Sequence, residues 1–168
     1  SYSTIIAEAA NINTSILSIK EKGIIIYIIH TFEKKGVLMS LMVDIGNTKT
    51  KYAHFVAGSI NEKGLCNTDE TPKIVYDYSE KVKNIMISSV KPIPDLVLSK
   101  PKNKDCKLVV LSSELEMPFK TRYRPPKTLG SDRLALVAGA VSVFSNRSVL
   151  IIDAGTCITF DFVDSKKN

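Results

Sequence analysis

The amino-acid sequence predicts an α/β fold, in which a mixed sheet flanked by helices is followed by the first hairpin of a duplicated second domain. Two apolar, strand-like runs each end in an Asp-x-Gly turn, at residues 44–46 and 153–155, and a returning strand follows each turn. Between them, residues 131–145 have the periodicity of an amphipathic helix. Because similar turns about a domain apart indicate a duplicated architecture, we expect a site in the cleft between the two copies.

The chain of 168 residues is about as long as one domain plus part of another. Residues 1–38 contain isoleucine-rich patches without a clear period, and we interpret them as a leader of unassigned origin. Residues 39–146 are expected to form the first domain. Residues 147–168 are expected to begin the second domain, of which only the first hairpin is present.

The first domain is expected to start with a β-hairpin. An apolar run over residues 37–43 predicts one strand, and the alternation over residues 50–56 predicts the strand that returns after a Gly-Asn turn. The further elements expected in this domain are strands over residues 85–90 and 108–112 and a short helix near residues 94–99.

The clearest helix is predicted over residues 131–145, with Gly130 and Ser131 supplying the break and the N-cap. Five apolar residues form a single stripe along it: Leu134, Val137, Ala138, Val141 and Phe144. A second hairpin should follow, with an apolar strand over residues 149–152 and an outgoing strand that alternates over residues 158–162. The apolar face of that hairpin is expected to be exposed.

Composition excludes several classes of protein. With 44% hydrophobic and 24% charged residues, the chain is typical of a folded protein and not of a disordered one. Its longest unbroken apolar stretch, residues 24–29, is far shorter than the ~20 residues that span a bilayer. No cleavage site for a signal peptide follows this stretch, so we expect a cytoplasmic protein without a membrane partner.

The net charge of +6 admits anionic partners, but the basic residues are scattered, so no nucleic-acid partner is expected. The three cysteines, Cys66, Cys106 and Cys157, are far apart in the sequence. They are expected to be reduced thiols rather than a disulfide framework or a zinc site. Two histidines give little support to a multi-histidine metal site.

The two Asp-x-Gly turns have the chemistry of a phosphate site. Glycine lets a phosphate approach the backbone N–H groups, and Thr48 and Thr156 add hydroxyl donors. The aspartate repels a phosphate directly but can hold a cation that bridges to it. Lys49 and Lys51 beside the first turn are candidates to neutralise a polyphosphate, although exposed hairpin lysines are the common alternative. No Walker-type or Rossmann-type glycine pattern occurs, so a nucleotide would bind on hairpin turns.

Asp132 falls in the first turn of the predicted helix, where the helix dipole stabilises its charge. One interpretation is an ordinary helix start with an acidic first turn. The other is an ionised carboxylate that takes a proton from an alcohol, with Arg133 beside it to bind an anionic substrate.

Three motifs in this order resemble those of the type III pantothenate kinases. They are Asp-x-Gly-Asn-Thr from Asp44, Tyr-x-x-Pro-x-x-Leu-Gly-x-Asp-Arg from Tyr123, and Asp-x-Gly-Thr from Asp153. The resemblance extends from about Leu41 to Asp164. It implies a ribonuclease-H-like domain of the actin/sugar-kinase/Hsp70-like superfamily.

The resemblance implies ATP-dependent phosphorylation of the primary hydroxyl of pantothenate, the first step of coenzyme A biosynthesis, by a cytoplasmic homodimer. The implied ATP-binding residues are Asp44, Ile45, Gly46, Asn47, Thr48, Lys49, Thr50, Lys51 and Thr156. The implied pantothenate-binding residues are Tyr123, Gly130, Ser131, Asp132 and Arg133, with Asp132 as the proton acceptor. Asp153 is the implied ligand of a monovalent cation, K⁺ or NH₄⁺, and Asp44 lies near the Mg²⁺ that accompanies ATP.

The sequence departs from the family pattern in three ways. Ser131 stands where the family often has alanine, Cys157 stands where a small residue is usual, and most of the second lobe is expected to be absent from these 168 residues. A second interpretation is therefore a non-catalytic module that binds a nucleotide or a partner and has an accessory, regulatory role. A third interpretation is another superfamily member, such as a sugar kinase or a phosphatase-like ATPase. The residues Gly130–Arg133 argue against this third interpretation.

Overall fold

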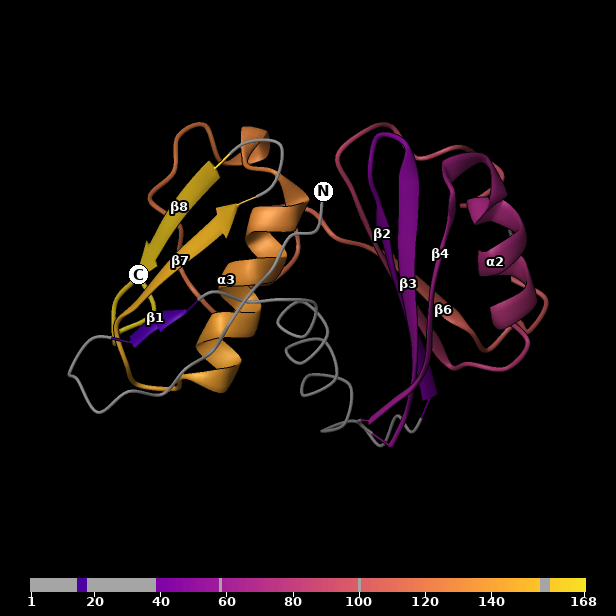
Figure 1. Ribbon diagram of the computed structural model, residues 1–168, viewed down its shortest axis with the longest axis horizontal. Helices are drawn as coiled ribbons and strands as arrows, with labels where there is room; N and C mark the ends of the chain where they lie inside the picture. The colour runs from indigo at the N-terminus through magenta and orange to yellow at the C-terminus, as the bar shows by residue number, and fades with distance from the viewer. Residues whose placement is uncertain (1–14, 18–38, 58, 100, 155–157) are drawn as a thin grey trace. The chain divides into compact units, whose positions relative to one another are not determined.

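The residues described in this computed structural model are 15–17, 39–57, 59–99, 101–154 and 158–168 (Figure 1). They fall into two compact units, residues 39–111 and residues 112–168 together with 15–17, and each unit is described by itself. The boundary expected after residue 38, between a leader and the first domain, and the boundary expected after residue 146, between the duplicated copies, both stay predictions.

The unit of residues 39–111 contains a five-stranded mixed sheet with the strand order β4-β3-β2-β5-β6. Its strands are β2 (Met39–Ile45), β3 (Lys49–Val56), β4 (Ser59–Asn67), β5 (Asn84–Ser89) and β6 (Lys107–Val110). β3 is antiparallel to both of its neighbours, β2 and β4, whereas β5 pairs in parallel with both β2 and β6. The predicted mixed sheet is confirmed.

The helix α2 (Thr71–Tyr78) lies beside this sheet, after a short 3-10 turn, η1 (Thr68–Glu70) (Figure 1). The sheet and the helix share one apolar core because alternate residues of each strand point to the same face. Its buried members are Leu41, Val43, Ile45, Val75, Tyr78, Val82, Ile85, Ile87, Val97 and Cys106. This core fixes the ends of β2 and β5, and the turn that begins at Gly46 follows β2 directly.

The other unit combines one helix with a small sheet. Its elements are η2 (Pro126–Thr128), α3 (Ser131–Val143), β7 (Val149–Ala154), β8 (Ile158–Val163) and the short β1 (Ser15–Leu17). The strand order is β1-β7-β8, with β7 and β8 antiparallel and β1 parallel to β7. Buried residues of α3 pack against Val149, Ile151 and Val163 of the two long strands.

Both predicted hairpins are confirmed, as are the strands near residues 85–90 and 108–112. The short helix expected near residues 94–99 is wrong. That segment forms turns in which the N–H groups of Val97 and Leu98 donate to carbonyls three residues earlier. Two such bonds close single turns and do not propagate into a helix.

The helix α3 corrects two details of the sequence analysis. Its N-cap is Gly130, because the backbone is still extended at Leu129 and Gly130 and helical geometry begins at Ser131. The buried residues of the helix also do not form the single stripe that was predicted, because the consecutive residues 134–141 are all buried.

β4 and α2 were not predicted from the sequence. β4 is mostly exposed and its polar residues show no alternation, so hydrophobic patterning gives no signal for it. α2 has only 8 residues, and buries three of them, Thr71, Val75 and Tyr78. A helix this short depends on its packing for stability.

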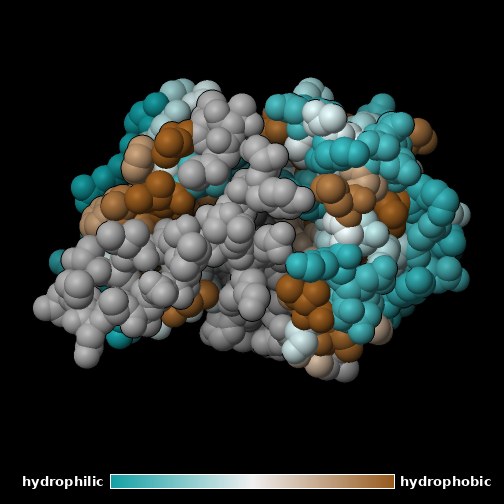
Figure 2. Space-filling view, viewed as in Figure 1, coloured by the Kyte–Doolittle hydropathy of each residue, from teal (hydrophilic) through white to brown (hydrophobic). Residues whose placement is uncertain are grey.

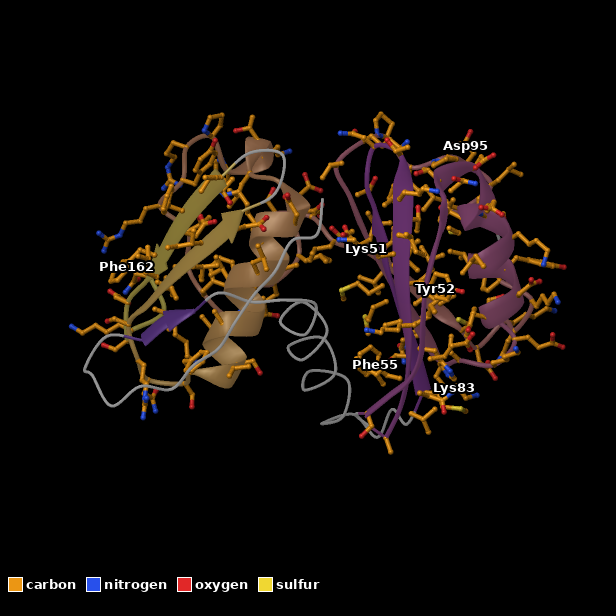
Figure 3. The ribbon with its side chains drawn as sticks, in the orientation of Figure 1. Lys51, Tyr52, Phe55, Lys83, Asp95 and Phe162 are labelled. Atoms are coloured by element: carbon orange, nitrogen blue, oxygen red, sulfur yellow. The ribbon has the colours of Figure 1, made fainter. Side chains whose placement is uncertain are left out.

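The outward face of β8 is apolar, as expected. Ile158, Phe160 and Phe162 are 63%, 62% and 63% exposed, while Val163 is buried. Figure 2 shows hydrophobic surface, in brown, over the region where Figure 1 draws β7 and β8, and Figure 3 shows Phe162 on this side. Asp161 alternates with these residues and therefore lies on the inward side of the strand.

The thiols of Cys66 and Cys106 are free, as predicted, and Cys157 lies outside the described residues. Among the helices in the described ranges, none is long and apolar enough to cross a membrane.

A partly buried polar cluster lies between β3, β4 and α2. The His54 ring is 7% exposed, its Nδ1 atom lies 3.4 Å from Asn61 Nδ2, and it packs against the Tyr78 ring at 5.4 Å between centroids. Tyr78 in turn donates a hydrogen bond to Glu62. His54 Nε2 is buried without a hydrogen-bond partner among the described residues. Burial lowers the pKa of His54, an effect that Glu62 opposes and Lys81 reinforces.

We therefore predict that His54 lowers the free energy of unfolding as the pH falls. Its pKa is lower in the folded state than the ~6.5 of an unfolded chain, so the unfolded state binds the proton more tightly. The loss begins as the pH falls through ~6.5 and continues until the pH is below the lowered pKa of the folded state. Urea unfolding at pH 7.5 and pH 5 should show a smaller pH dependence for His54→Gln than for the wild type. An equal pH dependence in both proteins would contradict this prediction.

Candidate functional site

The first Asp-x-Gly turn is closed by backbone hydrogen bonds. The Gly46 N–H donates to the Lys49 carbonyl at 3.0 Å, and the Thr68 N–H donates to the Thr48 carbonyl at 3.3 Å. The Thr68 hydroxyl lies 3.4 Å from the Gly46 carbonyl oxygen. A Cβ atom at Gly46 would lie 2.9 Å from the Lys49 carbonyl oxygen, so the turn requires glycine in its present shape. Asp44 lies just before the turn, opposite Lys51 on β3 and Ser88 on β5.

Three lysines surround this turn. Lys49 Nζ donates to Asn67 Oδ1 at 2.7 Å, and Lys91 Nζ donates to the Asn47 carbonyl at 3.0 Å. Lys51 is exposed on β3 (Figure 3). The turn thus combines a glycine backbone with nearby ammonium groups, which suits an anionic group such as phosphate.

Two residues of the predicted ATP loop have their side chains in the core. Ile45 is fully buried in the sheet core. Thr50 is also fully buried, and its hydroxyl lies 2.7 Å from the Thr71 hydroxyl at the start of α2. Both side chains hold the hairpin in place and do not line its surface, whereas Asn47, Thr48 and Lys49 are exposed.

The second group of predicted residues lies at the start of α3. The backbone is extended at Gly130, and the Asp132 carboxylate folds back so that its Oδ1 accepts the Arg133 N–H at 2.9 Å. A Cβ atom at residue 130 would lie 2.3 Å from Asp132 Oδ1. Gly130 therefore leaves the space that the Asp132 carboxylate occupies. Ser131, Asp132 and Arg133 are all half-buried.

The Arg133 side chain has a defined position. Its Nε and Nη2 atoms donate to the two carboxylate oxygens of Asp161, at 2.9 and 2.5 Å. Its guanidinium lies 5.3 Å from the centre of the Tyr123 ring. Hydrogen bonding to Asp161 raises the pKa of Arg133 above its usual range, so the guanidinium is charged at all relevant pH values.

The second Asp-x-Gly turn is described only in part, because residues 155–157, and with them Thr156, lie outside the described ranges. Asp153 is half-buried near the end of β7 and lies opposite Thr159 on β8. Thr159 Oγ1 is buried without a hydrogen-bond partner among the described residues. A carboxylate next to an unsatisfied hydroxyl oxygen is an oxygen-rich environment of the kind that hard cations bind.

The structure brings together Tyr123, Gly130, Asp132 and Arg133 at the start of α3, and Asp153 belongs to the same unit. The residues from Asp44 to Lys51 belong to the other unit. A shared groove between the two turns therefore stays a prediction.

Two residues near these sites, Asp161 and Lys91, were not predicted from the sequence. Asp161 is 28 positions from its partner Arg133, and Lys91 is 44 positions from Asn47. For Asp161 there was a usable signal, since an acidic residue at an inward position of an alternating strand needs a partner. For Lys91 the sequence offered no such signal, because its position near Asn47 follows from the parallel pairing of β5 with β2.

Comparisons with known proteins find relatives of this chain. A model of the type III pantothenate kinase family matches residues 40–168. A type III pantothenate kinase of Flavobacterium johnsoniae is 38% identical over 132 residues, which cover 77% of this chain and 54% of the relative. One of Bacteroides fragilis is 35% identical over 130 residues, covering 76% and 53%. A solved Baf family protein from Campylobacter jejuni is 23% identical with a TM-score of 0.43, covering 75% of this chain and 49% of that one.

The chain spans about half the length of the curated relatives that it matches. The family match nevertheless covers most of this chain, including Asp44, the segment from Tyr123 to Arg133, and Asp153. The chain therefore belongs to the type III pantothenate kinase family.

Proposed function

We propose that this protein transfers the γ-phosphoryl group of ATP to the primary hydroxyl of pantothenate, the first step of coenzyme A biosynthesis. The observation that carries the proposal is the start of α3, where the absence of a Cβ at Gly130 gives the Asp132 carboxylate its place beside Arg133. A half-buried carboxylate on a rigid helix end is suited to receive a proton from an alcohol.

In the proposed reaction, the pantothenate hydroxyl oxygen attacks the γ-phosphorus and its proton passes to Asp132. The bond between the γ-phosphorus and the bridging oxygen breaks, and ADP leaves. Phosphoryl transfer depends mainly on alignment and on neutralising charge. The backbone of the turn after Asp44 would bind phosphate oxygens, with Lys49 and Lys51 nearby, and Tyr123 and Arg133 would hold pantothenate.

We also propose that Asp44 lies near the Mg²⁺ that accompanies ATP, and that Asp153 is a ligand of K⁺ or NH₄⁺. Carboxylate oxygens and phosphate oxygens are ligands that hard cations prefer. Asp153 and the buried Thr159 hydroxyl offer oxygen ligands at the second turn. When bound, the cations would neutralise phosphate charge. A cytoplasmic homodimer with a pocket completed by the partner subunit is part of the same proposal.

An ADP-release assay with and without pantothenate, in the presence and absence of K⁺, tests the proposed function. ADP formation that requires pantothenate and is stimulated by K⁺ is the expected result. ADP formation without pantothenate would indicate a general ATPase instead. Nucleotide binding with no ADP formation under any condition would indicate the non-catalytic accessory module.

We predict that Lys91→Met raises the KM for ATP by about tenfold, because the Lys91 ammonium lies over the turn at Asn47 and is placed to bind phosphate. The matched control is Lys83→Met, since Lys83 is exposed next to the opposite end of β5 (Figure 3). Steady-state kinetics with varied ATP measure both variants. An equal rise in KM for the two would show a general effect of charge and contradict a local role of Lys91.

A further inference from the structure

The ion pair between Arg133 and Asp161 joins the start of α3 to the middle of β8. We propose that Asp161 is a positioning residue of the substrate site, which fixes the Arg133 guanidinium so that its remaining edge is offered to pantothenate. This inference rests on the proposed function, because Arg133 is the expected contact to the substrate.

The hydrogen bonds define how the guanidinium is turned. Asp161 accepts from Nε and Nη2 of Arg133, one bond to each carboxylate oxygen, at 2.9 and 2.5 Å. A guanidinium has five N–H groups in a fixed plane, so this bidentate contact leaves both on Nη1 and one on Nη2. These N–H groups point away from the Asp161 carboxylate, and they are the ones that a substrate oxygen can accept.

The same contacts remove much of the freedom of a long side chain before any substrate binds. The side chains of Arg133 and Asp161 are only 23% and 15% exposed, and the Tyr123 ring packs 5.3 Å from the guanidinium. A side chain that is already ordered loses less conformational entropy on binding, which strengthens binding without a new contact. Tyr123 and Asp161 thus hold Arg133 from two directions.

The pair also separates the roles of two adjacent residues. Asp132 accepts the backbone N–H of Arg133, whereas the Arg133 side chain forms its ion pair with Asp161. The carboxylate of Asp161 offsets the charge of Arg133. Arg133 therefore contributes directed hydrogen bonds to the substrate more than it contributes net positive charge.

The test combines Asp161→Asn with an Arg133→Met background. Asp161→Asn keeps the size of the side chain but removes the charge and one acceptor, so we expect the KM for pantothenate to rise about tenfold, with kcat and the KM for ATP changing less than about threefold. In the Arg133→Met background the same change should alter the KM for pantothenate less than about twofold, since Asp161 acts through Arg133. Glu114→Gln is the matched control, because Glu114 is an exposed carboxylate paired with Lys127 in the same unit.

A second readout follows the arginine directly. The Nε–H signal of Arg133 in a ¹⁵N NMR spectrum, assigned by its loss in Arg133→Lys, should be protected from exchange in the wild type and in Glu114→Gln and lost in Asp161→Asn. The inference is overturned if the signal disappears while the KM for pantothenate is unchanged, or if the KM rises equally in the Arg133→Met background. A wild-type chain that never forms ADP from pantothenate would instead overturn the proposed function, and with it the substrate role of Asp161.

Discussion

Asp132→Asn is expected to lower kcat for pantothenate phosphorylation by about a thousandfold while leaving the fold and ATP binding intact. Asparagine has nearly the same shape, and its side-chain oxygen still accepts the Arg133 N–H that Asp132 Oδ1 accepts now. The neutral asparagine side chain cannot accept the proton of the pantothenate hydroxyl group. The helix start loses one favourable charge, which costs at most about 1 kcal/mol of stability.

The measurement is ADP release at saturating substrates, together with a thermal melt and a titration with ATP. Asp95→Asn is the control, because it removes one exposed carboxylate from the other unit (Figure 3). Turnover within about threefold of the wild type in Asp132→Asn would rule out the base role and leave Asp132 as an ordinary acidic residue of a helix start.

Gly130→Ala is expected to lower kcat by about a hundredfold, although the residue bears no reactive group. The new Cβ would lie 2.3 Å from Asp132 Oδ1, so the carboxylate must leave its position. The backbone itself is not strained, because φ at Gly130 is −57°, which alanine adopts readily. Alanine is a poorer N-cap than glycine, and we expect a loss of at most about 1 kcal/mol in stability.

A double variant distinguishes this effect from a general disturbance of α3. If Gly130 acts by giving space to the Asp132 carboxylate, Gly130→Ala has little further effect on kcat in the Asp132→Asn background. The same hundredfold loss in both backgrounds would mean that the substitution acts elsewhere. The thermal melt of each variant shows whether the helix start is preserved.

Local sequence was sufficient for the hairpins and the motifs. The Gly46 turn is closed by a backbone hydrogen bond between neighbouring residues, and its glycine is required by an atom only three positions away. The extended backbone at Gly130 followed by helix is a similar short-range feature. Turn sterics and strand alternation act over a few residues, which is why patterns in the sequence predict them.

Hydrophobic patterning did not predict the elements that depend on contacts with residues distant in the sequence. The exposed, polar β4 exists because it pairs with β3, and the short α2 is stabilised by packing on the sheet. The stretch around Pro94 has the residues of a helix start but makes only single turns. In each case the free energy that decides the structure comes from contacts with distant residues.

The amino-acid sequence by itself determined the two Asp-x-Gly hairpins, the helix that begins after Gly130, and the ordered motifs that mark the family. Only the tertiary structure decided that Asp161 holds Arg133, that Lys91 reaches the turn at Asn47, and that Thr50 faces the core. The physical reason is range: backbone sterics specify a turn from adjacent residues, whereas a side chain's partner across the fold depends on strand register and on how helices pack.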